Sequence, residues 1–115
     1  MIEIKYENGK FVQRIVSYTK TDHCASKSRV AQLETDFPDR EIVCMTVFEG
    51  KRNVLLRSGV LMVLDPKHDI LITAYPVKWR RAQAMCYQAL GSPPPQYLSE
   101  AIYAIRNWDK EHGYI

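Results

Sequence analysis

The chain has 115 residues, of which 46% are hydrophobic and 25% are charged, and its formal net charge is +3. These values are typical of one globular domain with a modest core, and they exclude wholesale disorder. No apolar run approaches the ~20 residues of a membrane-spanning helix, and residues 1–7 lack the apolar segment of a secretory signal. We therefore expect a cytoplasmic protein with no membrane contact.

Three widely spaced cysteines, Cys24, Cys44 and Cys86, are the only ones in the chain. They form no C-x-x-C pair and are odd in number, so the sequence indicates neither a zinc site nor a disulfide framework. Reduced thiols and no bound metal or cofactor are the simplest expectation.

A β-hairpin is predicted at the start of the chain. Residues 2–7 alternate apolar and charged side chains, which is the period of a half-buried strand. Asn8-Gly9 follows, and both residue types tolerate the positive φ of a tight hairpin turn. Residues 11–18 are expected to form the second strand.

One helix is predicted after the hairpin. Its N-terminal cap is expected at Thr21, Asp22 or Ser26, because the side-chain oxygens of these residues accept bonds from free helix amides. The helix is expected to end at about Phe37, since the residue before Pro38 is disfavoured in the α conformation.

Four strands are predicted in the middle of the chain. Residues 41–48 are apolar on both faces, which favours a central strand. After a turn at 49–53, strands are expected at 54–56, 60–64 and 70–74. The last two are short and almost purely apolar, and the five polar residues between them suit a hairpin.

Two helices are predicted after Pro76. The first has apolar residues at helical spacing and ends near Gly91, a residue suited to the left-handed conformation after a helix. A triple proline leads to the second, whose apolar stripe comprises Leu98, Ala101, Ile102, Ile105 and Trp108. The element order is β-β-α-β-β-β-β-α-α. This order predicts a single α+β domain, residues 1–115, with a mostly antiparallel sheet and its helices on one face.

The phrase Ile70-Leu-Ile-Thr-Ala-Tyr-Pro76 forms the second strand of the predicted hairpin. The first apolar strand and the turn Asp-Pro-Lys-His-Asp precede it. The phrase resembles the closing strand of the small endoribonuclease superfamily that contains RelE-type, barnase-like and colicin-type toxins. The resemblance implies that Thr73 and Tyr75 line an active site. It also implies an upstream basic residue for acid–base and phosphate contacts, for which His23 with Arg29 is a plausible counterpart. The leading hairpin and the long continuation past Pro76 depart from the family pattern.

Metal-free cleavage of RNA needs a general base, a general acid and cations for the charge that develops on phosphorus. Histidine serves either proton role near neutral pH, so His23 and His68 are candidates. Arginine binds phosphate with two parallel hydrogen bonds. The predicted phosphate-binding residues are Arg57, Lys78, Arg80 and Arg81.

Structural roles compete with these assignments. His23 and His68 suit an exposed helix start and a solvated turn. Thr73 and Tyr75 suit a packed strand, and the basic residues around Trp79 suit the solvated flank of a core helix. The aromatic-rich segment 97–114 could bind a partner protein or a second copy, or could cover the domain's own sheet.

The sequence thus predicts a metal-independent RNA-binding or RNA-cleaving domain, with RNA and a protein inhibitor as partners and no cofactor. The alternative is a small non-enzymatic interaction protein of phage or mobile-element origin that binds another protein through its aromatic-rich helices, with a homodimer as one possible assembly.

Overall fold

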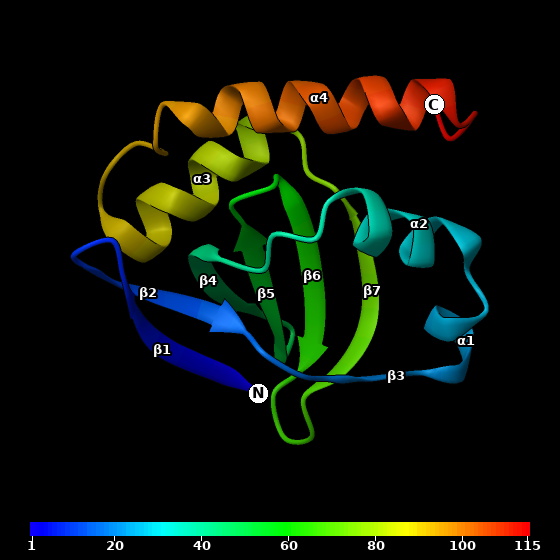
Figure 1. Ribbon diagram of the computed structural model, residues 1–115, viewed down its shortest axis with the longest axis horizontal. Helices are drawn as coiled ribbons and strands as arrows, with labels where there is room; N and C mark the ends of the chain where they lie inside the picture. Colours follow the sequence, from blue (N-terminus) through cyan, green and yellow to red (C-terminus); the bar gives the residue numbers. More distant parts are fainter.

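The computed structural model describes all residues, 1–115 (Figure 1). Its elements in chain order are β1 (Ile2–Glu7), β2 (Lys10–Ile15), β3 (Thr19–Lys20), α1 (Asp22–Ala25), α2 (Ser28–Asp36), β4 (Ile42–Phe48), β5 (Lys51–Leu56), β6 (Val60–Asp65), β7 (Ile70–Pro76), α3 (Trp79–Leu90) and α4 (Tyr97–Glu111). The predicted α+β class is confirmed, and both hairpins lie where the sequence placed them. None of the helices combines the length and the apolarity needed to cross a membrane.

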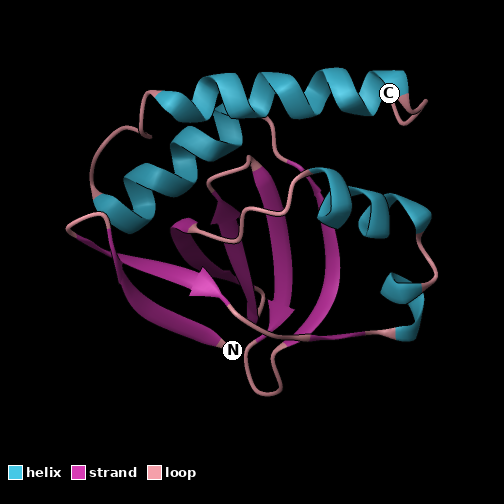
Figure 2. Ribbon diagram, viewed as in Figure 1, coloured by secondary structure: helices cyan, strands magenta, loops and turns pink.

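The strands form two sheets. Strands β1 and β2 make a two-stranded hairpin of their own, and the other five strands follow the order β3-β7-β6-β5-β4. Every pairing is antiparallel except that of β3 with β7, which is parallel. The hairpin and the helices surround the larger sheet (Figure 2).

Apolar side chains pack on both faces of the five-stranded sheet, so helices lie on both faces rather than on one as expected. Met45, Val54, Met62 and Ala74 are cross-strand neighbours on one face, and Cys44, Leu55, Leu61 and Tyr75 are neighbours on the other. The first set packs with residues of α1, α2 and β2, and the second packs with residues of α3. Alternation along each strand sends successive side chains to opposite faces, which is why two cores form.

Helix α4 belongs to both cores and crosses the end of the sheet (Figure 1). Leu98 and Ile102 pack with the α3 side, whereas Ile105 and Trp108 pack with the α2 side. The turn between β5 and β6 passes directly beneath this helix at Gly59, where an added Cβ would lie 3.2 Å from the backbone of Ala101 and Ile102. Gly59 therefore permits the close approach of α4.

Strand β4 is an edge strand, so the expectation of a central strand at 41–48 was wrong. Its inner residues are covered on both faces, by α3 at Cys44 and by the opposite core at Met45, which explains the two-sided apolar pattern. Its last two residues, Val47 and Phe48, are exposed. The central strand is β6, of which Val60 to Leu64 are all buried.

The predicted turn at 49–53 is shorter than expected. Glu49 and Gly50 have φ values of 51° and 74°, the conformation of a two-residue hairpin turn, and β5 begins at Lys51. Lys51 to Asn53 were expected in the turn. Instead, Arg52 pairs with Asp69, and Asn53 is buried in the sheet.

The predicted single helix before Pro38 is two helices. Thr21 caps α1, since its Oγ1 accepts a hydrogen bond from the amide of Cys24 at 3.1 Å. Helix α1 has only four residues, and α2 starts at Ser28 and ends before Phe37 and Pro38 as expected. The unexpected strand β3 directly precedes α1 and places it beside β7.

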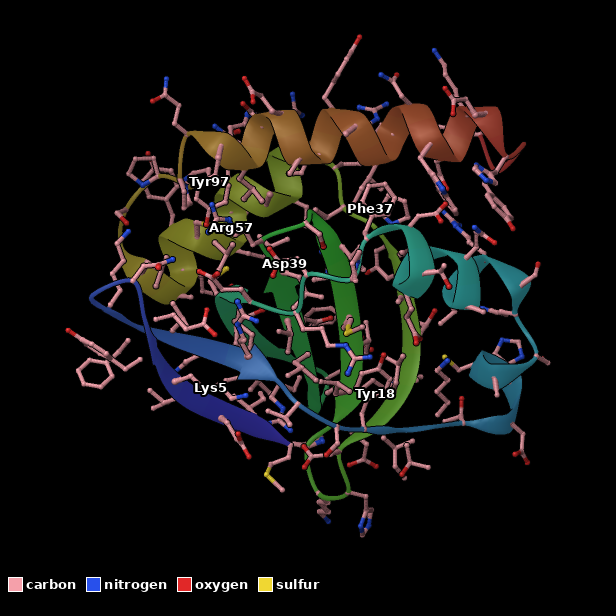
Figure 3. The ribbon with its side chains drawn as sticks, in the orientation of Figure 1. Lys5, Tyr18, Phe37, Asp39, Arg57 and Tyr97 are labelled. Atoms are coloured by element: carbon pink, nitrogen blue, oxygen red, sulfur yellow. The ribbon has the colours of Figure 1, made fainter.

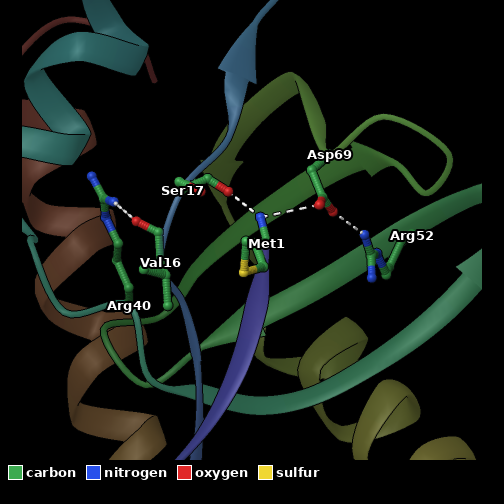
Figure 4. Close-up of polar contacts among 6 residues, drawn as sticks. All are labelled: Met1, Val16, Ser17, Arg40, Arg52 and Asp69. Atoms are coloured by element: carbon green, nitrogen blue, oxygen red, sulfur yellow. Dashed lines mark hydrogen bonds and ion pairs between the residues drawn. The ribbon is translucent and has the colours of Figure 1, made fainter.

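An ionic cluster fixes the start of the chain beneath the β6–β7 turn (Figure 4). The ammonium group of Met1 donates to the carbonyl oxygen of Ser17 and lies 3.2 Å from Oδ2 of Asp69. Asp69 also accepts from Arg52 Nη2 at 2.6 Å. The cluster joins β1, β5 and the turn that precedes β7, which ties the separate hairpin to the main sheet.

Candidate functional site

The end of β7 leads directly into α3 and carries several of the predicted site residues. Tyr75 and Pro76 end the strand, Val77 is buried, and Lys78 occupies the N-cap position of α3. The Lys78 side chain makes no capping hydrogen bond. The first backbone amides of this twelve-residue helix therefore have no side-chain acceptor at the N-cap position. Free amides and the helix dipole give such an end a partial positive charge.

A pocket of about 260 Å³ opens beside this junction. It lies between the end of β7, the start of α2 and the last turns of α4. Its lining residues are Arg29, Tyr75, Pro76, Val77, Lys78, Arg106, Asp109 and Ile115. We call it the β7–α4 pocket. Three of its side chains are cationic and one is acidic, so its lining attracts anions.

The cations of the pocket differ in how they are paired. Arg29 Nη2 donates to both carboxylate oxygens of the buried Asp109, at 2.7 and 2.6 Å. Neither Lys78 nor Arg106 has a carboxylate oxygen within the 4.0 Å of an ion pair. Arg29 is therefore held in place by the protein, and the charges of Lys78 and Arg106 are free for a ligand.

Two aromatic rings accompany these charges. The guanidinium of Arg29 lies 4.8 Å from the ring centroid of Tyr114, a cation–π contact. Tyr75 is partly buried, and its ring packs at the margin of the α3 core. Tyr75 lines the pocket, and its hydroxyl makes no hydrogen bond within the protein.

A second hollow continues the pocket along the outer face of α4. It also has a volume of about 260 Å³ and is lined by Tyr103, Arg106, Asn107, Lys110 and Ile115. Arg106 and Ile115 line both hollows, so the two adjoin. Spacings of three and four residues put Tyr103, Arg106, Asn107 and Lys110 on one face of the helix. A cationic track with exposed aromatic and amide side chains results.

Of the predicted site residues, Arg29, Tyr75 and Lys78 meet in the β7–α4 pocket. Thr73 lies two residues before Tyr75 on the same strand face, opposite Val63, but does not line the pocket. His23 is exposed on α1 and also lies outside the pocket lining. His68 is exposed in the turn between β6 and β7.

The remaining predicted phosphate ligands lie elsewhere. Arg57 follows β5, where its guanidinium lies 4.6 Å from the ring centroid of Tyr97 and 3.5 Å from Oε2 of Glu41 (Figure 3). Burial raises the pKa of Tyr97, although Arg57 partly opposes this shift. Arg81 lines a different hollow between α3 and β4, and Arg80 is exposed on α3.

Sequence reasoning missed Arg106 and Asp109, which supply a free cation and the anchor of Arg29. Both lie on α4, thirty residues and more from Tyr75 in the chain, and no local motif links them to it. Asp109 follows Ile105 by four residues and so lies on the apolar face of the helix, where a charged side chain is unusual and was the one available signal. Arg106 lies beside that face, where polar residues are ordinarily found. Only the crossing of α4 over the end of the sheet brings them to the site.

The aromatic residues of segment 97–114 are mostly used within the domain. Trp108 is 7% exposed and its Nε1 donates to Asp36 Oδ2 at 2.6 Å. Its ring also stacks with the rings of His112 and Tyr114. Tyr103 is different, because it is 69% exposed.

Histidine, cysteine, aspartate and glutamate side chains nowhere form a group of three or more that could hold a metal ion. Comparisons with protein-family models, with curated proteins and with solved structures find no match.

Proposed function

We propose that the chain binds single-stranded RNA, with a phosphate group in the β7–α4 pocket and the neighbouring nucleotides along α4. The observation that carries this proposal is that Lys78 and Arg106, whose charges are unpaired, line one pocket together with Tyr75. Cations of this kind contribute sequence-independent affinity for phosphates by releasing counterions from the nucleic acid.

Tyr103 favours a single strand as the ligand over a duplex. It is the most exposed aromatic side chain of α4, and it adjoins Arg106 and Lys110. Bases of a single strand are free to stack on such a ring, and stacking contributes about 1–3 kcal/mol per base. Alternation of stacking and phosphate contacts is the usual basis of binding to single strands.

Binding is better supported than cleavage. The β7–α4 pocket contains no histidine, and its one carboxylate side chain, that of Asp109, is held by Arg29. Cleavage, as the resemblance to endoribonuclease toxins implies, would need His23 to reach the bound strand from α1. RNA cleavage therefore stays a prediction. It requires that His23→Ala and Tyr75→Phe abolish the formation of shorter products without changing the melting temperature.

The binding test is a titration of a labelled single-stranded RNA followed by fluorescence anisotropy. Lys78→Glu and Arg106→Glu are expected to weaken binding roughly ten-fold each, because each reverses a charge at a phosphate contact. Lys5→Glu is the matched control, since it makes the same change of charge on the β1–β2 hairpin, outside both hollows (Figure 3). Equal losses in all three variants would contradict a defined site.

A second candidate function, binding of a partner protein, is favoured by the tip of the β1–β2 hairpin rather than by α4. Ile4, Tyr6 and Phe11 are 66%, 67% and 78% exposed on one face of the hairpin. The rings of Tyr6 and Phe11 pack edge to face at 5.1 Å. Large exposed apolar residues of this kind are typical of protein interfaces. The test compares the double variant Tyr6→Ser, Phe11→Ser with the single variant Lys78→Glu. If the double variant abolishes the cellular function of the protein and Lys78→Glu leaves it intact, this second candidate replaces the first.

A further inference from the structure

Two cysteine side chains from opposite sides of the α3 core are in contact. Cys44 lies on β4 and Cys86 on α3, and their sulfur atoms are 3.8 Å apart. Cys44 is 4% exposed and Cys86 is 0% exposed, and their neighbours in this core are apolar. Forty-two residues separate them in the chain, so the contact joins the strand at the sheet edge to the helix that covers it.

We propose that Cys44 and Cys86 are an oxidation site at which a small disulfide compound, of the glutathione class, converts the two thiols into a disulfide between β4 and α3. A disulfide has a sulfur–sulfur distance of about 2.05 Å, so the sulfur atoms must approach by roughly 2 Å from their present contact. Side-chain rotation together with a small shift of α3 supplies movement of this size.

The reaction is a pair of thiol–disulfide exchanges. The thiolate of one cysteine attacks the small disulfide, forms a mixed disulfide and releases one small thiol. The second cysteine, after loss of its proton, attacks the protein sulfur of the mixed disulfide and releases the second small thiol. The two cysteines are oxidised by two electrons in total, the small disulfide is reduced to two thiols, and the two protons end on those thiols.

Burial makes this oxidation slow under native conditions. It raises the pKa of the Cys44 thiol to about 12 and also raises the pKa of Cys86, so little of the reactive thiolate is present at neutral pH. A hollow of about 220 Å³ opens on the seam between α3 and β4 and is lined by residues of both elements, including Phe48, Arg81 and Met85, but neither cysteine lines it. Met85 is the immediate neighbour of Cys86. Oxidation is therefore expected when α3 loosens from the sheet.

The disulfide would fix α3 to the edge of the sheet. The closed loop contains β5, β6 and β7 as well as Lys78. A cross-link that closes a loop of this length restricts the unfolded chain and so favours the folded state. The expected shift is a rise of about 10 °C in the melting temperature of the oxidised protein.

The experiment exposes the full chain to oxidised glutathione, maps its peptides without reduction and measures its melting temperature before and after. A peptide linking Cys44 to Cys86, together with a higher melting temperature that a reductant reverses, is the expected result. Cys24→Ser is the matched control, because Cys24 is equally buried but has no cysteine within bonding distance. It should oxidise like the original chain, and Cys86→Ser should not form the cross-link.

Peptides that carry only glutathione at Cys44 or Cys86, or an unchanged pair of thiols after prolonged oxidation, would overturn the proposal. A cross-link that lowers the melting temperature would overturn its stabilising role. The peptide map of the original chain decides the question even if Cys86→Ser fails to fold.

Discussion

Arg29 on α2 and Asp109 on α4 are eighty residues apart in the chain, yet one nitrogen of the arginine binds both oxygens of the aspartate, at 2.7 and 2.6 Å. This pair joins the two layers that border the β7–α4 pocket. Asp109 is almost fully buried, while the Arg29 side chain is 29% exposed. The pair therefore has two effects, since it stabilises the packing of α4 and neutralises one cation of the pocket.

Asp109→Asn separates these two effects. The amide keeps the size of the side chain but removes the charge that neutralises Arg29, so we expect tighter binding of single-stranded RNA and a loss of about 1–3 kcal/mol in the free energy of unfolding. Anisotropy and denaturant unfolding measure the two quantities. Arg29→Met should destabilise more, by about 3–5 kcal/mol, because it leaves the Asp109 carboxylate buried and unpaired. Weaker RNA binding in Asp109→Asn would contradict the assignment of Arg29 to the site.

Gly59 tests the docking of α4 on the sheet. Gly59→Ala forces a side chain into a backbone with φ of 88° and places its Cβ 3.2 Å from the α4 backbone. We expect the free energy of unfolding to fall by about 2–4 kcal/mol. Gly50→Ala is the matched control, since Gly50 has φ of 74° and no atom within 4 Å of the added Cβ. Equal losses in the two variants would mean that the close approach of α4 contributes nothing.

Trp108→Phe tests the polar contact beneath α4. The indole donates to Asp36 at 2.6 Å. The hydrogen bond from Gln32, and after it this bond from Trp108, lowers the pKa of Asp36. The phenyl ring keeps most of the apolar packing but removes the donor, so we expect a loss of about 1–2 kcal/mol in the free energy of unfolding. Tyr103→Phe, on the exposed face of the same helix, should leave it unchanged within about 0.5 kcal/mol. Chemical denaturation distinguishes the two.

Asp69 gives the stability a defined dependence on pH. Partial burial acts to raise its pKa, but the Met1 ammonium and the Arg52 guanidinium outweigh this effect and hold the pKa below its usual value. A lowered pKa in the folded state stabilises the protein above the unfolded value of about 3.9, and the contribution is lost as the pH falls through the folded value. Asp69→Asn should therefore lower the free energy of unfolding near neutral pH by less than about 1 kcal/mol, because the pair is partly exposed. The melting temperature should fall with it.

The control for Asp69 is the pH dependence itself. The difference in melting temperature between Asp69→Asn and the original chain should shrink towards zero well below the unfolded pKa, where the carboxyl group is protonated in both states. A difference that persists unchanged in acid would show that the contribution of Asp69 is not ionic.

Local patterns were sufficient to predict much of the fold. Asn8-Gly9 marked the first hairpin, and the almost purely apolar runs at 60–64 and 70–74 marked the second. Pro38 and Gly91 marked the ends of helices. In each case the signal lies within a few residues, because turn and cap conformations depend on the residues that adopt them.

Features that depend on distant contacts could not be predicted. Strand β3 has two residues, too few for any pattern, and exists only because it pairs with β7. The apolar pattern of β4 suggested a central strand, since covering layers on both faces give an edge strand the same appearance. The β7–α4 pocket required Arg106 to meet Lys78, and that meeting depends on the path of α4 across the sheet.

The central claim is that the β7–α4 pocket and the adjoining face of α4 bind a single strand of RNA. Its most direct test is an NMR titration of the isotope-labelled chain with a short single-stranded RNA, in which shift changes are followed residue by residue. We predict saturable changes at Tyr75, Lys78, Tyr103 and Arg106, with none at Tyr6 and Phe11 on the hairpin. Saturable changes confined to the hairpin, or none at all, would contradict the claim.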